Sequence, residues 1–303
     1  MRMQTPWGDC PVSDAHVHFF SRRFFDALGT QCRKSAEEVA AAAGWVLPPA
    51  SAAELAATWA AELDRAGVTA AVLIASVPGD EPSVQAAVTA FPGRFYAYAM
   101  VNPMVENAAA SLQLSPALHA LCLFPAMHRY SMHDARVESL LARAEAAAHT
   151  PAIFVHCGVL TVGVRKKLGL PSLFDMRFSN PIDLHAVAVE HPRLKFIVPH
   201  FGAGYFREAL MLADLCPNVY LDTSSSNSWM RYEGLDLRTV FRRTLDVAGA
   251  GRLLFGTDSS FFPRGWNDDI FDVQTRTLLD LGICERDARL ILGENLQGIF
   301  ENR

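Results

Sequence analysis

The sequence lacks the features that mark several large classes of protein. Among its 303 residues no apolar stretch approaches the ~20 residues that a membrane-spanning helix needs. Residues 1–11 do not contain the apolar segment of a signal peptide. The net charge of -5 is small and dispersed, without the basic patch that binds nucleic acid or a run of like charges. We therefore expect a cytoplasmic protein whose partners include neither a membrane nor a nucleic acid.

Paired cysteines and two common catalytic motifs are also missing. None of the six cysteines belongs to a Cys-x-x-Cys pair, so reduced thiols are expected. Residues 202–204 read Gly-Ala-Gly before a helical segment, but the full Gly-x-Gly-x-x-Gly of a dinucleotide site is absent. Residues 224–226 are serines without the Gly-x-Ser-x-Gly turn of a serine hydrolase. Cys157 follows a histidine, and we interpret it as a packing residue and not as a nucleophile.

The pattern that the chain does contain is a repeated alternation of strands and helices. Hydrophobic residues make up 50% of the sequence, and eight short apolar segments are expected to be strands buried on both faces. A helical segment follows most of them, which predicts an α/β protein of the (β/α)₈ barrel (TIM barrel) type, with residues 1–303 in a single domain. The expected strands are 12–18, 70–76, 95–101, 118–124, 152–156, 194–199, 219–222 and 253–256.

Three connections that follow expected strands are long. They are residues 19–50, 157–181 and 223–234, and in a (β/α)₈ barrel all three would lie on the face that carries the active site. Ser51, with Glu54 three residues later, has the spacing of a capping box at a helix start. The expected helices are 51–66, 82–90, 105–114, 136–149, 182–190, 205–215, 235–247, 268–281 and 285–300.

Five polar residues stand at the carboxyl ends of expected strands. They are four histidines and one aspartate: His16, His18, His156, His200 and Asp258. In a barrel the carboxyl ends of all the strands open onto one face, so these side chains should converge there. The His-Val-His spacing places two imidazoles on the same face of one strand, because side chains alternate along it. A single histidine of this kind would indicate little, but the set indicates a site.

Imidazole nitrogen and carboxylate oxygen are ligands that a borderline divalent ion prefers. Two imidazoles from the first strand, a third from the fifth and a carboxylate from the eighth would supply four ligands and leave room for a water. A bound Zn²⁺ lowers the pKa of such a water toward ~7, which makes hydroxide available at neutral pH. We therefore expect one divalent metal ion, with Zn²⁺ as the first expectation and Mn²⁺ as the alternative.

These motifs resemble those of the amidohydrolase superfamily, in particular its amidohydrolase-related (amidohydrolase 2) branch. That branch includes decarboxylases similar to aminocarboxymuconate semialdehyde decarboxylase and hydrolases similar to pyrone-dicarboxylate lactonase. The resemblance extends over residues 12 to 300. The segments that carry it are Asp14-Ala-His-Val-His18, Val155-His-Cys-Gly158, residues 191–202, Gly256-Thr-Asp258, Gly293-Glu-Asn295 and Ile299-Phe300.

The resemblance implies a role for each of the five polar residues. It implies that His16, His18, His156 and Asp258 bind the metal, and that His200 orients or deprotonates the water. Asp258 would also accept a proton during catalysis. Many members of the superfamily carry a carboxylated lysine at the end of the fourth strand, where it bridges two metals. The fourth expected strand of this chain has no lysine, so one metal is expected.

The expected activity is hydrolysis of a lactone, ester or amide bond through a metal-activated water. Non-oxidative decarboxylation of an aromatic or unsaturated acid is the alternative, and the residues do not separate the two. A catalytically silent binding barrel is disfavoured, because buried polar groups are costly unless they are paired or ligated. The substrate should be a small carboxylate, since the branch acts mostly on carboxylated rings or lactones, with Arg129, Arg165 and His128 as candidates to bind it. A homodimer is compatible with this sequence.

Overall fold

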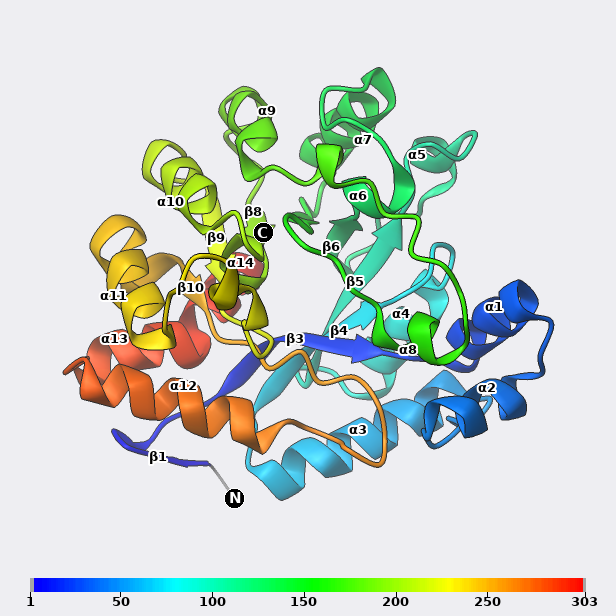
Figure 1. Cartoon of the computed structure of the whole chain (residues 1–303), viewed down its shortest axis with the longest axis horizontal. Helices are drawn as coiled ribbons and strands as arrows, with labels where there is room; N and C mark the ends of the chain where they lie inside the picture. Colours follow the sequence, from blue (N-terminus) through cyan, green and yellow to red (C-terminus); the bar gives the residue numbers. More distant parts are fainter. Residues whose placement is uncertain (1–2, 302–303) are drawn as a thin grey trace.

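Eight parallel strands form the centre of the structure, a computed structural model in which residues 3–301 are described (Figure 1). From β3 to β10, each strand pairs with the next one along the chain, which confirms the predicted (β/α)₈ barrel. The strands are β3 (Ser13–Phe19), β4 (Ala70–Ala75), β5 (Phe95–Val101), β6 (Leu118–Leu123), β7 (Ala152–Val155), β8 (Phe196–Val198), β9 (Val219–Asp222) and β10 (Leu253–Leu254). A short hairpin of β1 (Gln4–Thr5) and β2 (Gly8–Asp9) precedes them.

Helices that follow the strands pack around the outside of the barrel, mostly where the sequence predicts them (Figure 1). α3 (Ala52–Ala66) begins after Ser51, whose side chain accepts the N–H of Glu54 at 3.4 Å. In the expected helix 105–114 only α5 (Ala108–Ser111) is helical. The others are α4 (Glu81–Ala90), α6 (Pro125–His128), α7 (Ala135–Glu145), α9 (His185–Glu190), α10 (Phe206–Leu215), α11 (Leu237–Ala248), α12 (Asp268–Asp280), α13 (Glu285–Arg289) and α14 (Asn295–Glu301). A π-helical turn over Leu290–Glu294 joins the last two.

The barrel closes between its first and last strands. The N–H of Ala15 donates to the carbonyl of Phe255 at 2.8 Å, and the N–H of His18 donates to that of Ser259 at 2.7 Å. In return, the N–H of Asp258 donates to the carbonyl of His16 at 3.0 Å. These bonds place the His-Val-His segment beside Asp258, although the two lie near opposite ends of the chain.

Burial on both faces explains why the strands have continuous apolar sequences. In β4, Val72 and Ile74 pack inside the barrel with Phe154, whereas Leu73 packs outward with the helices. Phe300 of α14 packs in the inner cluster near the amino ends of β5 and β6, so the last helix closes the barrel at the end opposite the strand ends that carry the five polar residues. None of the described helices is long and apolar enough to span a bilayer.

Two of the three long loops contain helices that the sequence analysis left as loops. Residues 19–50 contain α1 (Arg22–Cys32) and α2 (Ala36–Ala43), and residues 157–181 contain α8 (Gly163–Lys167). α2 has a complete capping box between Ser35 and Glu38. The apolar faces of these three helices form a separate cluster that includes Phe25, Val39 and Val164. The third loop contains a 3₁₀ turn over Ser228–Tyr232.

Candidate metal centre

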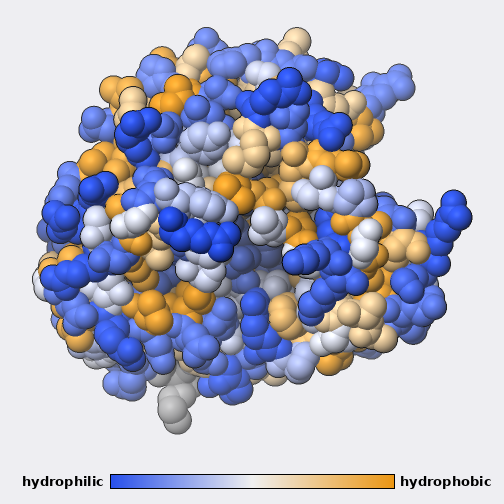
Figure 2. Space-filling view, viewed as in Figure 1, coloured by the Kyte–Doolittle hydropathy of each residue, from blue (hydrophilic) through white to orange (hydrophobic). Residues whose placement is uncertain are grey.

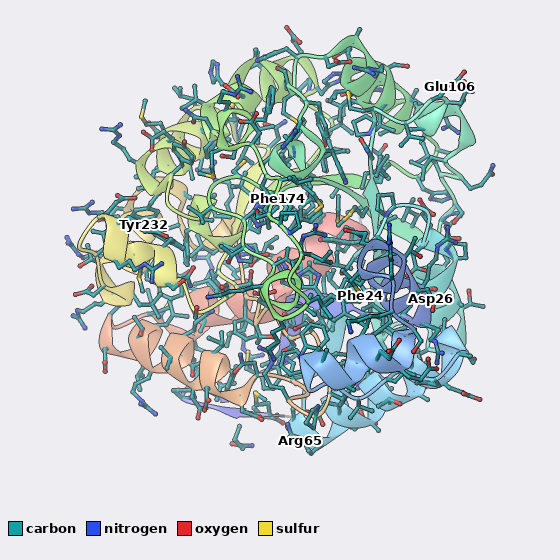
Figure 3. All side chains as sticks on the ribbon, turned by 45° about the vertical axis from the view of Figure 1, so that its right-hand side comes forward. Phe24, Asp26, Arg65, Glu106, Phe174 and Tyr232 are labelled. Carbon is teal, nitrogen blue, oxygen red and sulfur yellow. The ribbon has the colours of Figure 1, made fainter. Side chains whose placement is uncertain are left out.

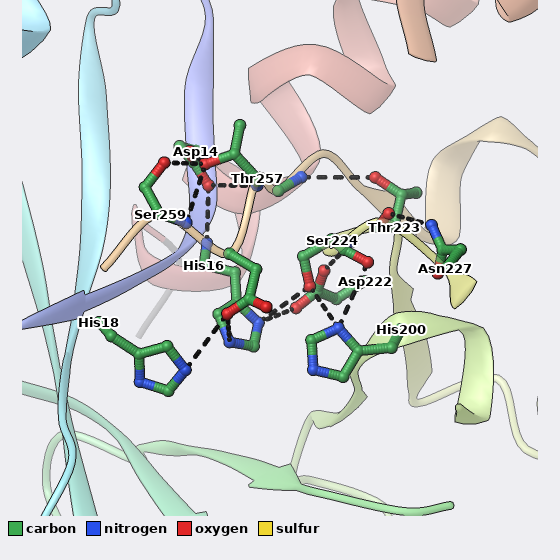
Figure 4. A network of polar contacts seen from close by, with 12 residues as sticks. Asp14, His16, His18, His200, Asp222, Thr223, Ser224, Asn227, Thr257 and Ser259 are labelled. Atoms are coloured by element: carbon green, nitrogen blue, oxygen red, sulfur yellow. Dashed lines mark hydrogen bonds and ion pairs between the residues drawn. The ribbon is translucent and has the colours of Figure 1, made fainter. Parts of the chain in front are cut away.

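Three of the five predicted residues form a compact group of ligand-type atoms. One ligand atom from each of His16, His18 and Asp258 lies within 4.8 Å of the other two; Figure 4 labels the two histidines. The Oδ1 of Asp258 lies 3.3 Å from Nε2 of His18 and 3.7 Å from Nε2 of His16. The Nε2 of His16 is buried and has no hydrogen-bond partner among the described residues. A buried nitrogen without a partner is costly, so this group fits a bound cation that would complete it.

His156 and His200 lie next to this group but are not part of its shortest contacts. The ring centroid of His200 is 4.9 Å from that of His16 and 5.3 Å from that of His156. His156 stacks on Phe124 and its buried Nδ1 has no hydrogen-bond partner among the described residues. The structure therefore brings all five predicted residues to one end of the barrel, where they line the same cavity.

The backbone is in the left-handed region at two of these residues. The φ angle is 58° at Asp258 and 56° at His200, and neither residue is a glycine. Such conformations are uncommon for residues with a side chain and persist where the surrounding structure enforces them, often at functional sites. At Asp258 the closing hydrogen bond to β3 supplies that constraint.

A buried carboxylate that the sequence analysis did not single out holds His16. Asp222, at the end of β9, is fully buried, and its Oδ2 lies 2.7 Å from Nδ1 of His16. Ser224 Oγ lies 3.0 Å from the same nitrogen and 2.9 Å from Nδ1 of His200. Asp222 is also a polar residue at the end of an expected strand, so the rule that found the other five applies to it.

A second buried carboxylate, Asp14, holds the segment that contains His16 and His18. Asp14 accepts hydrogen bonds from the backbone N–H of His16 at 2.9 Å, from Thr257 Oγ1 at 2.5 Å and from Trp266 Nε1 at 2.7 Å. Burial raises the pKa of Asp14 to about 6 despite these donors. Because Thr257 adjoins Asp258, this network connects the His16 segment of β3 to the Asp258 segment at the place where the barrel closes.

The titration of the site follows from burial and from the contacts between its members. Burial opposes ionisation of Asp258, but the hydrogen bond with His18 and the nearby imidazoles outweigh it, so its pKa lies below the usual range. Burial lowers the pKa of His18, His156 and His200. His16 differs, because Asp222 outweighs burial and raises its pKa. An ionised carboxylate beside mainly neutral imidazoles is the protonation state that metal ligation requires.

A cavity of about 770 Å³ opens above the five polar residues. The recess and its mixed rim of hydrophobic and hydrophilic residues are visible in Figure 2. One wall is aromatic: Phe20 stacks on His18 with ring centroids 5.4 Å apart, Trp45 on Phe20 at 5.4 Å, and Phe261 on Trp45 at 4.6 Å. Figure 3 labels three further aromatic lining residues, one from each long loop: Phe24, Phe174 and Tyr232.

The three predicted substrate-binding residues have different positions. His128 lines the cavity, its buried Nδ1 has no hydrogen-bond partner among the described residues, and burial lowers its pKa to about 4. Arg165 also lines the cavity, but its guanidinium donates to the carbonyl of Pro171 and to Gln31 Oε1. Arg129 does not line the cavity, and its Nε donates to the carbonyl of Leu173 at 2.8 Å.

Comparisons with known proteins agree with the barrel fold. A family model described as Amidohydrolase matches residues 13–295. A Bordetella bronchiseptica structure described as an uncharacterized TIM-barrel protein has a TM-score of 0.65 and 20% identity, with 97% of this chain and 100% of that chain covered. A Pseudomonas putida structure described as "Putative 2-Pyrone-4,6-Dicarboxylic Acid Hydrolase" has a TM-score of 0.62 and 18% identity, with 96% and 98% covered.

Two further similarities have lower sequence identity or lower coverage. An amidohydrolase structure from Burkholderia multivorans with bound zinc has a TM-score of 0.61 and 15% identity, with 96% of this chain and 99% of that chain covered. At such identities the likeness shows the fold alone. Protein fluG of Emericella nidulans is 34% identical over 86 residues, which are 28% of this chain and 10% of that protein. The chain thus spans about a tenth of the length of that relative.

Proposed function

The chain belongs to the amidohydrolase family, and we propose that it is a mononuclear metal-dependent hydrolase that acts on a small carboxylated lactone, ester or amide. In this proposal His16, His18, His156 and Asp258 hold the metal, with Zn²⁺ first and Mn²⁺ as the alternative. His200 is the fifth member of the site and contacts the reacting water.

A single observation carries the proposal. Ligand atoms of His16, His18 and Asp258 lie within 4.8 Å of one another at the floor of a large cavity. The buried Nε2 of His16 and Nδ1 of His156 have no hydrogen-bond partners among the described residues. A barrel that only bound partners would have no reason to retain these unpaired groups, since each is costly to bury.

When bound, a divalent cation supplies Lewis acidity, which polarises an oxygen of water or substrate. The remaining chemistry belongs to the chain. Asp258, with its low pKa, is ionised at neutral pH and can hold a proton transiently at the carboxylate oxygen that is not directed at His18. His200 is neutral because burial and His16 lower its pKa, so its free ring nitrogen can accept a proton from water.

The cavity wall supports a flat, carboxylated substrate. The stack of Phe20, Trp45 and Phe261 offers aromatic faces beside the metal group. Among the cavity-lining arginines, Arg165 is engaged by Pro171 and Gln31, whereas Arg231 donates within the described residues to Tyr232 Oη at 3.1 Å. We therefore assign carboxylate recognition first to Arg231, ahead of the predicted Arg165 and Arg129.

The first experiment is metal analysis of the purified protein followed by a substrate panel. The panel contains carboxylated lactones, esters and amides together with aromatic and unsaturated acids, and both acid release and CO₂ are recorded. We expect about one divalent metal per chain and loss of activity after chelation. Two metals per chain, or full activity after exhaustive chelation, would contradict the mononuclear site. Release of CO₂ without bond hydrolysis would favour the decarboxylase alternative.

A second experiment separates the roles of two histidines. His156→Ala should lose most of its metal, because one of four ligands is removed. His200→Ala should retain the metal but lose catalysis. His149→Ala, at an exposed position after α7, is the matched control and should change neither. If His200→Ala lost its metal as fully as His156→Ala, the division of roles would be wrong.

A further inference from the structure

Two residues at the carboxyl end of β9 contact imidazoles that come from two other strands. We name Asp222, Thr223 and Ser224 the β9 end. The Oδ2 of Asp222 lies 2.7 Å from Nδ1 of His16, and Ser224 Oγ lies 2.9 Å from Nδ1 of His200 (Figure 4). We propose that Asp222 and Ser224 are positioning residues that fix which ring nitrogen of His16 and of His200 carries the hydrogen. This inference rests on the proposed function.

The contact with Asp222 sets the state of His16. Oδ1 of Asp222 accepts the backbone N–H of Ser224 at 2.6 Å, which leaves Oδ2 to accept from the imidazole. A carboxylate oxygen accepts hydrogen bonds, so Nδ1 of His16 is the nitrogen that carries the hydrogen. The lone pair is then on Nε2, the buried atom without a partner that lies 3.7 Å from Oδ1 of Asp258. A carboxylate behind a ligating histidine also makes that imidazole a stronger ligand.

Ser224 sets the state of His200 in the same direction. Nδ1 of His200 faces both the hydroxyl of Ser224 at 2.9 Å and its backbone carbonyl at 3.3 Å. The carbonyl can only accept, so it favours a hydrogen on Nδ1 of His200. The lone pair of Nε2 is then the part of the ring that is available to the cavity. Because Ser224 Oγ also lies 3.0 Å from Nδ1 of His16, one hydroxyl contacts both imidazoles.

Hydrogen bonds from two other segments hold the β9 end in place, as a positioning role requires. Thr223 Oγ1 lies 2.6 Å from Oε1 of Gln274 in α12, and Nε2 of Gln274 donates to the carbonyl of Thr223 at 2.9 Å. Asn227 Nδ2 donates to the same carbonyl at 3.2 Å. Asp222, Thr223 and Ser224 are all fully buried. The β9 end is thus held by a helix and a loop that do not themselves contact His16, His18 or Asp258.

The first test compares the Zn²⁺ affinity of two substituted proteins. Competition with a chromophoric chelator would measure binding of Zn²⁺ alone to the metal-free protein. Asp222→Asn keeps the size but removes the charge, and we expect it to weaken binding about 10–100-fold. Thr223→Val is the matched control, because it removes a buried hydrogen bond one residue away without touching an imidazole; it should lower the melting temperature but keep the affinity within about twofold. Equal affinities for Asp222→Asn and wild type would overturn the proposal.

The second test reads the tautomers directly and does not require a bound metal. ¹⁵N spectra of the metal-free, histidine-labelled wild-type protein distinguish a ring nitrogen that carries hydrogen from one that does not. We expect hydrogen on Nδ1 of both His16 and His200, with signals assigned by their loss in His16→Gln and His200→Gln. Ser224→Ala removes the hydroxyl and keeps the backbone carbonyl, so it should shift the His200 signals while the hydrogen stays on Nδ1, and it should leave the His16 signals nearly unchanged, since Asp222 remains.

The two tests also separate this inference from the proposed function. If wild type failed to bind Zn²⁺ stoichiometrically but both rings carried hydrogen on Nδ1, the proposed metal function would fail and the positioning role would stand. If wild type bound Zn²⁺ but His16 carried its hydrogen on Nε2, the positioning role would be refuted alone. The wild-type spectrum decides this even if Asp222→Asn does not fold.

Discussion

Gly158 is the position where a single methyl group should disturb the site most. It has a φ angle of +76°, and a Cβ atom there would lie 2.2 Å from the carbonyl oxygen of Gly202 and 2.3 Å from that of Ala203. Those carbonyls belong to the segment after His200, while Gly158 closely follows His156. Gly158→Ala should therefore push apart the two loops that carry these histidines.

The magnitude follows from two separate costs. A left-handed backbone costs a residue with a side chain about 1–2 kcal/mol, and forcing a methyl group against packed backbone costs about 1–3 kcal/mol. Together they predict about 2–5 kcal/mol of destabilisation, which corresponds to a fall in melting temperature of roughly 4–10 °C, at about 2 °C per kcal/mol for a chain of this length. Metal content and activity should fall as well, because His156 moves relative to His16.

The matched control is Gly163→Ala in the same loop. No atom lies within 4 Å of a Cβ at Gly163, so this substitution should be neutral or slightly stabilising. Thermal unfolding and metal analysis of both proteins would measure the difference. A Gly158→Ala protein that melts within about 2 °C of wild type and retains its metal would refute the reasoning, since 1 kcal/mol alone should shift the melting temperature by about that amount.

Three further predictions concern the rim, the thiols and a buried histidine. Arg231→Met should raise KM for a carboxylate substrate about 10–100-fold at unchanged metal content, because a hydrogen bond to a charged group contributes about 1.5–3 kcal/mol; an unchanged KM would exclude Arg231 as the carboxylate ligand. A thiol reagent should modify exposed Cys284 quickly and leave buried Cys157 unmodified until unfolding, because burial also raises the pKa of Cys157. His191 is buried, and despite that burial its hydrogen bonds with Glu145 and Glu138, each 3.1 Å, raise its pKa. His191→Gln should therefore lower the free energy of unfolding by about 1 kcal/mol below pH ~6.5, where the wild-type imidazole is charged in both the folded and the unfolded state. The loss should become smaller as the pH rises through the raised pKa of the folded protein. Equal losses of unfolding free energy in urea at pH 6 and pH 9 would contradict this.

The strands could be predicted because a parallel barrel buries both faces of each strand. Segments such as 70–75 are then apolar throughout, and no alternation with polar residues is needed to recognise them. The helices α1 and α2 could not be found in the same way. Their apolar faces are completed by Val164 of α8, more than a hundred positions away, so the pattern within residues 19–50 is too weak to identify them.

The clustering of the candidate metal ligands could be predicted because barrel geometry fixes where the strand ends meet. This rule needs no knowledge of loops, and it placed His16, His18 and Asp258 together correctly. It also applied to Asp222, but the sequence gives no sign that this carboxylate faces His16. A single acidic residue at a strand end belongs to no motif that would identify the residue it contacts. Its role depends on a contact between the first and seventh strands of the barrel.

The positions of the candidate substrate-binding residues depend on contacts between loops, which no local sequence pattern reveals. Arg129 has a φ angle of 58°, and its side chain turns to the carbonyl of Leu173 instead of the cavity. Arg165 faces the cavity but joins α8 to α1 through Gln31, and Lys167 Nζ donates to the carbonyl of Ala43 in α2. Both cations therefore hold two loops together above the site. A carboxylate that bound Arg165 would have to break this link, so recognition of substrate charge and movement of the loops would be coupled there, whereas at Arg231 they would be independent.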